Sequence, residues 1–337
     1  MILPPRTRAS TIEPNQNGSD YNPPGTWCQP SRTYAQFILT SEAVRVVAIV
    51  VTYHPDLTRL QLQLEELASQ VAAIVIVDNA SDSDLAVWAA SRTGNPPHVI
   101  ALERNHGIAH AQNVGVQWAR SQAATHILLM DQDSVPSTDM VDALLDAALN
   151  NPVVAAVGPR YLDSRQDAPS PFVRIRGLRF QRMAWDPGHP VVRVDCLIAS
   201  GCLIPMSVID QVGPMREDLF IDYVDTEWCL RARNMGLQSY GVCTASMSHS
   251  LGETPYFFLG RSFPVHSPLR HYYQVRNAIT LIREHWVPTD WKLALGWHLL
   301  LKVGFYSLVM APRLQHLRMM VTGLWHGMRG RAGPLTP

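Results

Sequence analysis

Continuous apolar runs alternate with amphipathic segments between residues 44 and 148, and this alternation constrains the fold more than any other feature of the sequence. The run VRVVAIVV at 44–51 is rich in β-branched residues, which is typical of a strand covered on both faces. Further apolar runs lie at 72–77, 99–102 and 126–130, with amphipathic helical segments after the first and third strands. Strands that alternate with helices predict an α/β domain with a mainly parallel, doubly wound sheet.

Polar side chains follow each of the four predicted strands. Ligands of open α/β sheets bind outside the carboxyl ends of the strands, so these side chains predict a ligand site at that edge. They are Thr52 and Tyr53, Asp78 and Asn79, Glu103 to Asn105, and Asp131 to Asp133.

Two common nucleotide-binding motifs are missing. The turn after the first predicted strand reads TYHPDL and has no glycine, so the GxGxxG fingerprint of dinucleotide-binding enzymes is absent. The chain also has no GxxxxGK[ST] sequence. A nicotinamide dehydrogenase and a P-loop enzyme are both disfavoured.

The stretch THILLMDQDSVP places Asp131 and Asp133 directly after a buried-looking strand. Carboxylates spaced in this way hold Mg²⁺ or Mn²⁺ together with substrate phosphates, and they also occur in solvated turns. Their position at the predicted ligand edge favours the cation site.

The stretch FIDYVDTEWCLR carries Asp222, Asp225 and Glu227 around the start of a helix predicted at 226–235. Acidic residues in the first turn of a helix are ordinary capping chemistry. Asp225, just before that helix, is also placed to act as a general base.

His249 and Arg276 each allow two interpretations. His249 follows a predicted strand, where a histidine is either an ordinary surface or core residue or a further ligand of the cation. Arg276 lies beside Tyr272 and Tyr273, where it either stacks on the rings or binds a phosphate group.

Taken in order, VVTYHP, VDNAS, ERNHGIAHAQNVGV, LLMDQDS, SGCLIP, FIDYVDTEWCLR, SHSLG and YYQVRNAI resemble family-2 glycosyltransferases over residues 44–285. The combination is most similar to the bacterial rhamnosyltransferase branch, which builds cell-surface polysaccharide such as O-antigen and cell-wall glycans. The resemblance implies a GT-A type fold, in which a Rossmann-like mixed sheet is flanked by helices.

The resemblance also implies the donor-binding residues. Thr52 and Tyr53 match positions that hold the base and ribose, and Asp78, with Asn79 beside it, matches the acid that binds the pyrimidine. Gly107 and Asn113 match the donor loop, Asp131 the first acid of the DxD motif, and Arg276 a diphosphate contact.

For the cation and the chemistry, the resemblance implies Asp133 and His249 as metal ligands, Asp225 as catalytic base and Glu227 as a later acid. One position departs from the family pattern: Val224 stands where an acid precedes the base. Asp222 is the nearest carboxylate that could replace it.

An inverting transferase with Mg²⁺ or Mn²⁺ follows from this resemblance. It would move L-rhamnose from dTDP-L-rhamnose to a lipid-linked or growing glycan, with no nucleic acid partner. Two alternatives stay open. A nucleotidyltransferase needs a glycine-rich basic loop that TYHPDL does not supply, and a non-catalytic sugar-nucleotide-binding protein needs no base.

Composition predicts three regions: a disordered arm at 1–42, rich in Pro, Asn, Ser and Thr, a catalytic domain at 43–260, and a basic helical segment at 261–337. From Trp291 onward there are six Lys or Arg and no acid, which leaves 22 basic against 28 acidic residues in the rest. A basic apolar segment predicts attachment to a membrane face.

The predicted helix at 291–310 has its polar positions, Lys292, His298, Lys302 and Ser307, on one half of its surface. This pattern predicts a helix that lies in the membrane interface, and a core-packed helix is the alternative. The N-terminus lacks a signal-peptide run, and five cysteines without a CxxC pair indicate reduced thiols. We therefore expect a cytoplasmic protein, peripheral on the inner face of the plasma membrane.

Overall fold

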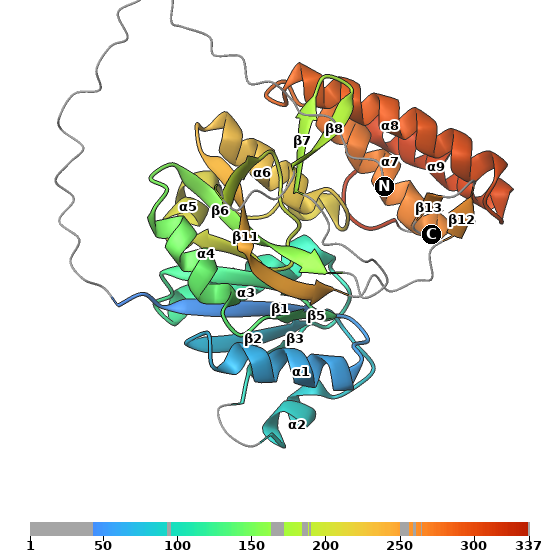
Figure 1. Ribbon diagram of the computed structural model, residues 1–337. Helices are drawn as coiled ribbons and strands as arrows, with labels where there is room; N and C mark the ends of the chain where they lie inside the picture. The colour runs from blue at the N-terminus through green and yellow to red at the C-terminus, as the bar shows by residue number, and fades with distance from the viewer. Residues whose placement is uncertain are drawn as a thin grey trace, which may run out of the picture. The chain divides into compact units, whose positions relative to one another are not determined.

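A nine-stranded mixed sheet forms the centre of the fold, in the order β3-β2-β1-β4-β10-β6-β11-β5, with β9 paired to β11 (Figure 1). The four predicted strands are present and parallel to one another. They are β1 (Val46–Thr52), β2 (Ala73–Asp78), β3 (His98–Ala101) and β4 (His126–Asp131). The sheet becomes mixed at β10 (Cys202–Pro205), which runs antiparallel to both of its neighbours.

The computed structural model describes residues 43–92, 96–162, 172–183, 188, 190–249, 256–258, 261–263 and 265–335. The predicted arm at 1–42 lies outside the described residues, and residues 44–337 form one compact unit. The remaining sheet strands are β5 (Ser134–Pro136), β6 (Val154–Leu162), β9 (Val191–Val194) and β11 (Gln238–His249). Two hairpins lie off the sheet: β7 (Phe172–Arg176) with β8 (Arg179–Met183), and β12 (Tyr256–Phe258) with β13 (Arg261–Phe263).

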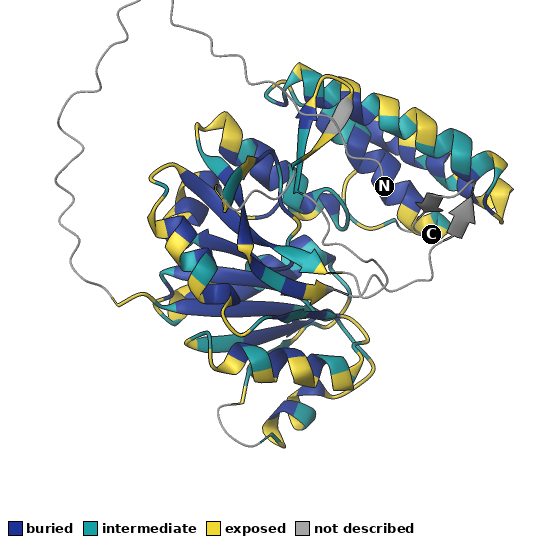
Figure 2. Ribbon diagram, viewed as in Figure 1, coloured by how far each residue is buried: buried dark blue, intermediate teal, exposed yellow. Residues whose placement is uncertain are grey.

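Helices cover both faces of the sheet, which explains why β1, β2 and β4 are apolar along most of their length. Val46, Ala48 and Val50 of β1 point to the face covered by α1 (Leu57–Ala68), α2 (Leu85–Ala90) and α4 (Met140–Leu149). Val47 and Ile49 point to the other face, under α3 (Ile108–Ser121), α5 (Met206–Val212) and α6 (Val224–Asn234). Figure 2 shows the strands buried between these layers.

The strand register brings the predicted polar residues to one edge. Thr52 at the end of β1 is paired with Asp78 of β2, and Val51 is paired with Asp131 of β4. The ends of these three parallel strands are therefore level, and the side chains that follow them meet.

Three helices complete the chain: α7 (Pro268–Arg283), α8 (Thr289–Leu308) and α9 (Arg313–Met328). α9 packs on α7 through glycines, because a Cβ at Gly323 would lie 2.5 Å from the carbonyl oxygen of Tyr272 and one at Gly327 would lie 2.8 Å from that of Arg276. Such close approach leaves no room for a larger residue at either position.

A pair of buried histidines lies between α7 and α9. The Nδ1 atoms of His271 and His316 are 2.9 Å apart, so a single shared proton satisfies both, and Nε2 of His271 has no hydrogen-bond partner among the described residues. Burial lowers the pKa of His271 to about 3 and also lowers the pKa of His316. Both rings are therefore neutral in the folded protein at pH 7.

Acid is expected to destabilise this packing. Below pH 6.5, a histidine whose pKa is lower in the folded protein than in the unfolded chain takes up a proton on unfolding. The stability of the fold is therefore fully present above pH 6.5 and decreases as pH falls from 6.5 towards 3. The free energy of unfolding should fall by up to about 1.4 kcal/mol per pH unit below pH 6.5 for each such histidine. Urea unfolding of the His271→Gln variant should show a smaller slope between pH 7 and 5.

The exposed Gln315, next to His316, supplies the control, because Gln315→Ala removes no titratable group and should leave the slope unchanged. An unchanged slope in His271→Gln would show that the buried pair does not titrate on unfolding.

Candidate active site

The exits of β1 and β2 are joined by a buried hydrogen-bond network around Asp78. Its carboxylate accepts hydrogen bonds from the Thr52 hydroxyl at 2.8 Å and from the Ser81 N–H at 2.8 Å. Thr52, Asp78 and Asn79 are almost fully buried. A carboxylate can accept further bonds beyond these, so Asp78 keeps some capacity for a ligand donor group.

Tyr53 lies at the open end of this network, with 47% of its surface exposed. Its backbone is locked to the DQD turn: its N–H donates to Oε1 of Gln132 at 2.7 Å, and its carbonyl accepts from Nε2 of Gln132 at 3.2 Å. The middle residue of the motif therefore fixes the β1 exit, while the Tyr53 ring is free to cover a flat ligand.

The DQD turn itself is held by two buried side chains. Nε2 of Gln63, from α1, donates to the carbonyl oxygens of Asp131 and Ser134, each at 2.6 Å. The Ser200 hydroxyl accepts from the Asp131 N–H at 3.1 Å and donates to the Ser134 hydroxyl at 2.8 Å. Since the backbone polar groups are satisfied by these neighbours, the turn is built to hold its two carboxylates in fixed positions.

The carboxylates of Asp133 and Asp225 lie near enough to that of Asp131 to affect its pKa. Burial raises the pKa of Asp131 to about 7, the carboxylates of Asp133 and Asp225 add to the rise, and the Arg270 guanidinium opposes it. Like charges held together in a partly buried site favour a bound cation, and two carboxylates with substrate phosphates suit Mg²⁺ or Mn²⁺. The described residues contain no cluster of three or more His, Cys, Asp or Glu that could hold a metal without such phosphates.

Asp225 lies in the first turn of α6, because the helix begins at Val224, two residues earlier than the predicted start at 226. Burial raises its pKa, Asp222 adds to the rise, and hydrogen bonds from the backbone of Thr226 and Ala199 oppose it. The Thr226 N–H is 2.7 Å from Oδ1 of Asp225, so that oxygen is oriented by the backbone. A carboxylate with a raised pKa is a stronger proton acceptor than an exposed one.

The loop that leads into α6 is strained. Phe220, Asp222 and Tyr223 all have positive φ, at 65°, 63° and 65°. Non-glycine residues in this region cost free energy and persist only where the surroundings hold them. Asp222 is held by Arg270, whose Nη2 lies 3.1 Å from Oδ1 of Asp222, and this ion pair makes Asp222 less available as a base than Asp225.

Arg276 and Asn277 of α7 hold this loop through hydrogen bonds to its backbone. Nδ2 of Asn277 donates to the carbonyl oxygens of Leu219, Ile221 and Asp222 at 2.8–2.9 Å. The Arg276 guanidinium, which is 1% exposed, donates to the carbonyl oxygens of Asp218, Leu219 and Gly333. The structure thus places Arg276 against the loop backbone and over two tyrosine rings rather than at the sheet edge.

Removing the Asn277 amide should destabilise the protein. Asn277→Ala leaves one buried and two partly buried carbonyl oxygens with fewer donors, so the free energy of unfolding should fall by about 2–4 kcal/mol. Thr280→Ala, one turn further along α7, removes one bond to the Arg276 carbonyl and should cost less than about 1.5 kcal/mol. Chemical denaturation of both variants makes the comparison, and equal losses would contradict the role assigned to Asn277.

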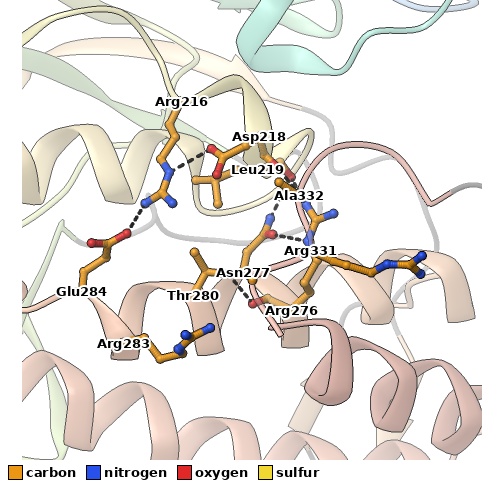
Figure 3. A pocket seen from close by; sticks show the side chains of 11 residues that line it. Arg216, Asp218, Leu219, Arg276, Asn277, Thr280, Arg283, Glu284, Arg331 and Ala332 are labelled. Carbon is orange, nitrogen blue, oxygen red and sulfur yellow. Dashed lines mark hydrogen bonds and ion pairs between the residues drawn. The ribbon is translucent and has the colours of Figure 1, made fainter. Parts of the chain in front are cut away.

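A cavity of about 260 Å³ lies beneath the same loop, between α7 and residues 330–332 (Figure 3). Charged side chains in its wall form ion pairs with one another, since Arg216 lies 2.8 Å from Asp218 and 2.6 Å from Glu284. None of the three clustered carboxylates lines this cavity, which is therefore separate from the candidate active site.

Gly107 and Asn113, predicted to lie in the donor loop, contact the 215–220 segment that precedes α6. Gly107 has a φ of +88°, and a Cβ there would lie 2.4 Å from the Phe220 carbonyl oxygen. The Asn113 amide bonds both backbone polar groups of Met215 and Oε1 of Glu217. In this structure Asn113 connects α3 to the 215–217 segment, and its polar atoms face the protein.

Glu227 and His249 complete the predicted set. Glu227 is 2% exposed and bonds Arg231 of the same helix, at 3.0 and 3.1 Å, so it does not reach the carboxylate cluster through its own oxygens. The backbone of His249 pairs with Ser134, which brings β11 beside the DQD turn. The His249 side chain lies outside the described residues.

Three contributors escape prediction from the sequence: Gln63, Gln132 and Arg270. Gln63 sits on the buried side of an amphipathic helix, and a polar residue at such a position signals a bonded partner. Arg270 carries no local signal, because its partners Asp131 and Asp222 are distant in the sequence.

Residues 48–200 match the family model for glycosyl transferase family 2. The chain is 32% identical over 290 residues to dTDP-rhamnosyl transferase RfbF of Shigella flexneri, covering 86% of this chain and 97% of that protein. It is 24% identical over 282 residues to the low-salt glycan biosynthesis hexosyltransferase Agl10 of Haloferax volcanii, covering 79% of this chain and 85% of that one.

Two solved structures share the fold. S. aureus TarS 1–349 in complex with UDP-GlcNAc superposes with a TM-score of 0.56 at 16% identity, over 86% of this chain and 82% of that one. GalNAc-T7 with UDP, GalNAc and Mn²⁺ superposes with a TM-score of 0.54 at 13% identity, over 86% of this chain and 56% of that one. The mixed sheet flanked by helices is therefore the GT-A type that the sequence predicts.

Proposed function

The chain belongs to glycosyl transferase family 2, and from that premise we propose that it transfers L-rhamnose from dTDP-L-rhamnose to a growing glycan with inversion at the anomeric carbon. The choice of donor is supported by the similarity to RfbF, which extends over 97% of that protein. The activity as a glycosyltransferase follows from the family itself.

One observation carries the proposed chemistry: the carboxylates of Asp133 and Asp225 both lie close enough to Asp131, at the carboxyl edge of the sheet, to raise its pKa, although Asp225 is 94 positions further along the chain. Two of these carboxylates come from the exit of β4 and the third from the first turn of α6. A pair of acids for a metal–diphosphate group beside a separate acid for proton removal is the set that sugar transfer requires.

In the proposed step, the acceptor hydroxyl oxygen forms a bond to the anomeric carbon on the face opposite the diphosphate. The bond between that carbon and the diphosphate oxygen breaks, and dTDP leaves with the bonding electrons. Asp225 takes the hydroxyl proton. Its burial favours proton uptake, and the Thr226 N–H holds its carboxylate in place.

Asp133 and Asp131 would hold a divalent cation, which supplies electrostatic stabilisation of the negative charge on the leaving diphosphate. Tyr53 would cover the base, with Thr52 and Asp78 beneath it. The Arg270 guanidinium, close to Asp131 and paired with Asp222, would lie next to the sugar or its diphosphate.

Product analysis tests this function against its alternatives. Wild-type protein incubated with dTDP-rhamnose and Mn²⁺, with no acceptor, should slowly release dTDP and free rhamnose, because water can replace the acceptor. A nucleotidyltransferase given pyrophosphate would instead form dTTP and rhamnose 1-phosphate. A binding protein would leave the donor intact, and either of the last two results would overturn the proposal.

A further inference from the structure

The solvent-facing side of α8 is apolar along its length. After Thr289 at its start, every exposed residue of the helix is large and hydrophobic, and the spacing puts them all on one face. They are Leu293, Trp297, Leu300, Leu301 and Leu308, exposed by 47–73%. In a helix that faces water, this side would carry the polar residues.

Lys302, a polar residue in the second half of α8, points towards α7 instead. Lys302 donates to Oε1 of Gln274 on α7 at 2.7 Å, and burial lowers its pKa. The sequence predicts a polar half on this helix, and the structure turns Lys302 of that half towards α7. Lys302 thus has its hydrogen-bond partner on α7. The leucine face of α8 has no partner in the described part of the chain.

α9 shows the same inverted arrangement. It buries His316, Gly323, His326 and Gly327 against its neighbours. It exposes a set of apolar residues, and the two helices contact each other. The exposed large apolar residues of α9 are Leu314, Leu317, Val321, Leu324, Trp325 and Met328. We call the exposed apolar residues of both helices the α8–α9 face.

The charge around the α8–α9 face is of one sign. Arg313, Arg318 and Arg329 are exposed on or beside α9, and the chain has no Asp or Glu after Asp290. The Arg329 guanidinium lies 4.0 Å from the centre of the Trp325 ring. Arginine beside exposed tryptophan and leucine suits a boundary between anionic headgroups and acyl chains.

We propose that the α8–α9 face docks on a lipid bilayer that contains anionic lipids, with both helices lying along the membrane surface. Among the described residues, no helix combines the length and the apolar character needed to cross a bilayer. Shallow insertion of the leucine face, with the arginines at the headgroups, fits this surface and the inverted arrangement of both helices. This inference stands on the geometry of α8 and α9 and does not rest on the donor sugar.

Vesicle sedimentation of the full chain tests the proposal, without donor or metal. The probes are vesicles of phosphatidylcholine alone and vesicles with added phosphatidylglycerol. The double variant Leu300→Gln/Leu314→Gln changes two residues that are 69% and 82% exposed, so folding should survive. Arg313→Gln/Arg318→Gln removes two charges, and Leu62→Gln, 51% exposed on α1, is the matched control.

Wild-type protein and Leu62→Gln should bind the anionic vesicles, with binding weakened by salt. Each double variant should lower the partition coefficient by about tenfold or more. Equal binding by wild type and both double variants, or no binding by wild type, would overturn the proposal. A wild-type dimer in light scattering that Leu300→Gln/Leu314→Gln disrupts, with no vesicle binding, would assign the face to a second copy of the chain.

A truncation near His285 is unsuitable for this test. It would remove α9 from α7 and the Gly333 carbonyl from the Arg276 guanidinium. Loss of membrane binding in such a fragment would not be separable from loss of folding.

Discussion

Replacing Asp225 with asparagine is expected to lower the rate of sugar transfer by about 10²- to 10⁴-fold, the contribution of a general base. The change keeps the size of the side chain and its bond from the Thr226 N–H, but the amide cannot take a proton. Donor binding should survive, because the residues proposed to bind base and diphosphate lie at the exits of β1, β2 and β4. Steady-state kinetics with a saturating acceptor separates the two effects.

Two neighbouring acids serve as matched controls for that assignment. Asp222→Asn breaks an ion pair with Arg270, and Glu227→Gln weakens a pair with Arg231, so both should reduce the rate less than Asp225→Asn does. If Asp225→Asn kept more than about a tenth of the wild-type rate, it would not be the base. If Asp222→Asn abolished transfer instead, the base would lie three residues upstream.

Replacing Asp133 with asparagine should lower the transfer rate at least about 100-fold and weaken the effect of Mn²⁺ on donor binding. A bound cation supplies several kcal/mol of stabilisation to a developing diphosphate charge, and each 1.36 kcal/mol is worth a factor of ten in rate. Loss of one carboxylate also relieves repulsion on Asp131, so its pKa should move down from about 7.

Asp142→Asn, which removes an exposed carboxylate from the first turn of α4, is the control and should leave both donor affinity and rate nearly unchanged. Donor affinity that is the same with Mn²⁺ and with EDTA, in wild type and in Asp133→Asn alike, would show that no cation site exists at the DQD turn.

The sheet and the position of its ligand edge are predictable from the sequence, because strand periodicity is a local property. A continuous apolar run such as 44–51 indicates a strand that is covered on both faces, and the polar residue that follows it marks the end of the strand. The mixed character of the sheet is harder to predict from the sequence. β10 is only four residues long, and its antiparallel direction depends on which strands it joins.

The supporting side chains are harder to predict because their partners are distant. Asn113, Arg276 and Glu227 belong to recognisable motifs, yet the structure has their polar atoms bonded to backbone or to Arg231. A motif records that a residue lies near a site, whereas the direction of its side chain depends on the tertiary packing. Asn277 shows the reverse case, in which an unassigned motif residue holds the strained loop before Asp225.

The orientation of α8 is hard to predict for a related reason. A helical wheel identifies two faces, but it does not say which face meets water. The wheel puts Lys292 and Lys302 on a polar half, and the structure bonds Lys302 to Gln274 of α7. The side of α8 that carries the exposed Leu300 and Leu301 is set by packing against α7, a tertiary contact that a helical wheel does not contain.

The central claim is that the edge formed by β1, β2 and β4 binds dTDP-rhamnose with a divalent cation, and calorimetric titration of the donor tests it most directly. With Mn²⁺ present, dTDP-rhamnose should bind the full-length protein more tightly than UDP-galactose, UDP-N-acetylglucosamine or GDP-mannose. EDTA or Asp133→Asn should weaken that binding. Tighter binding of another donor, or no heat from dTDP-rhamnose in Mn²⁺, would contradict the account.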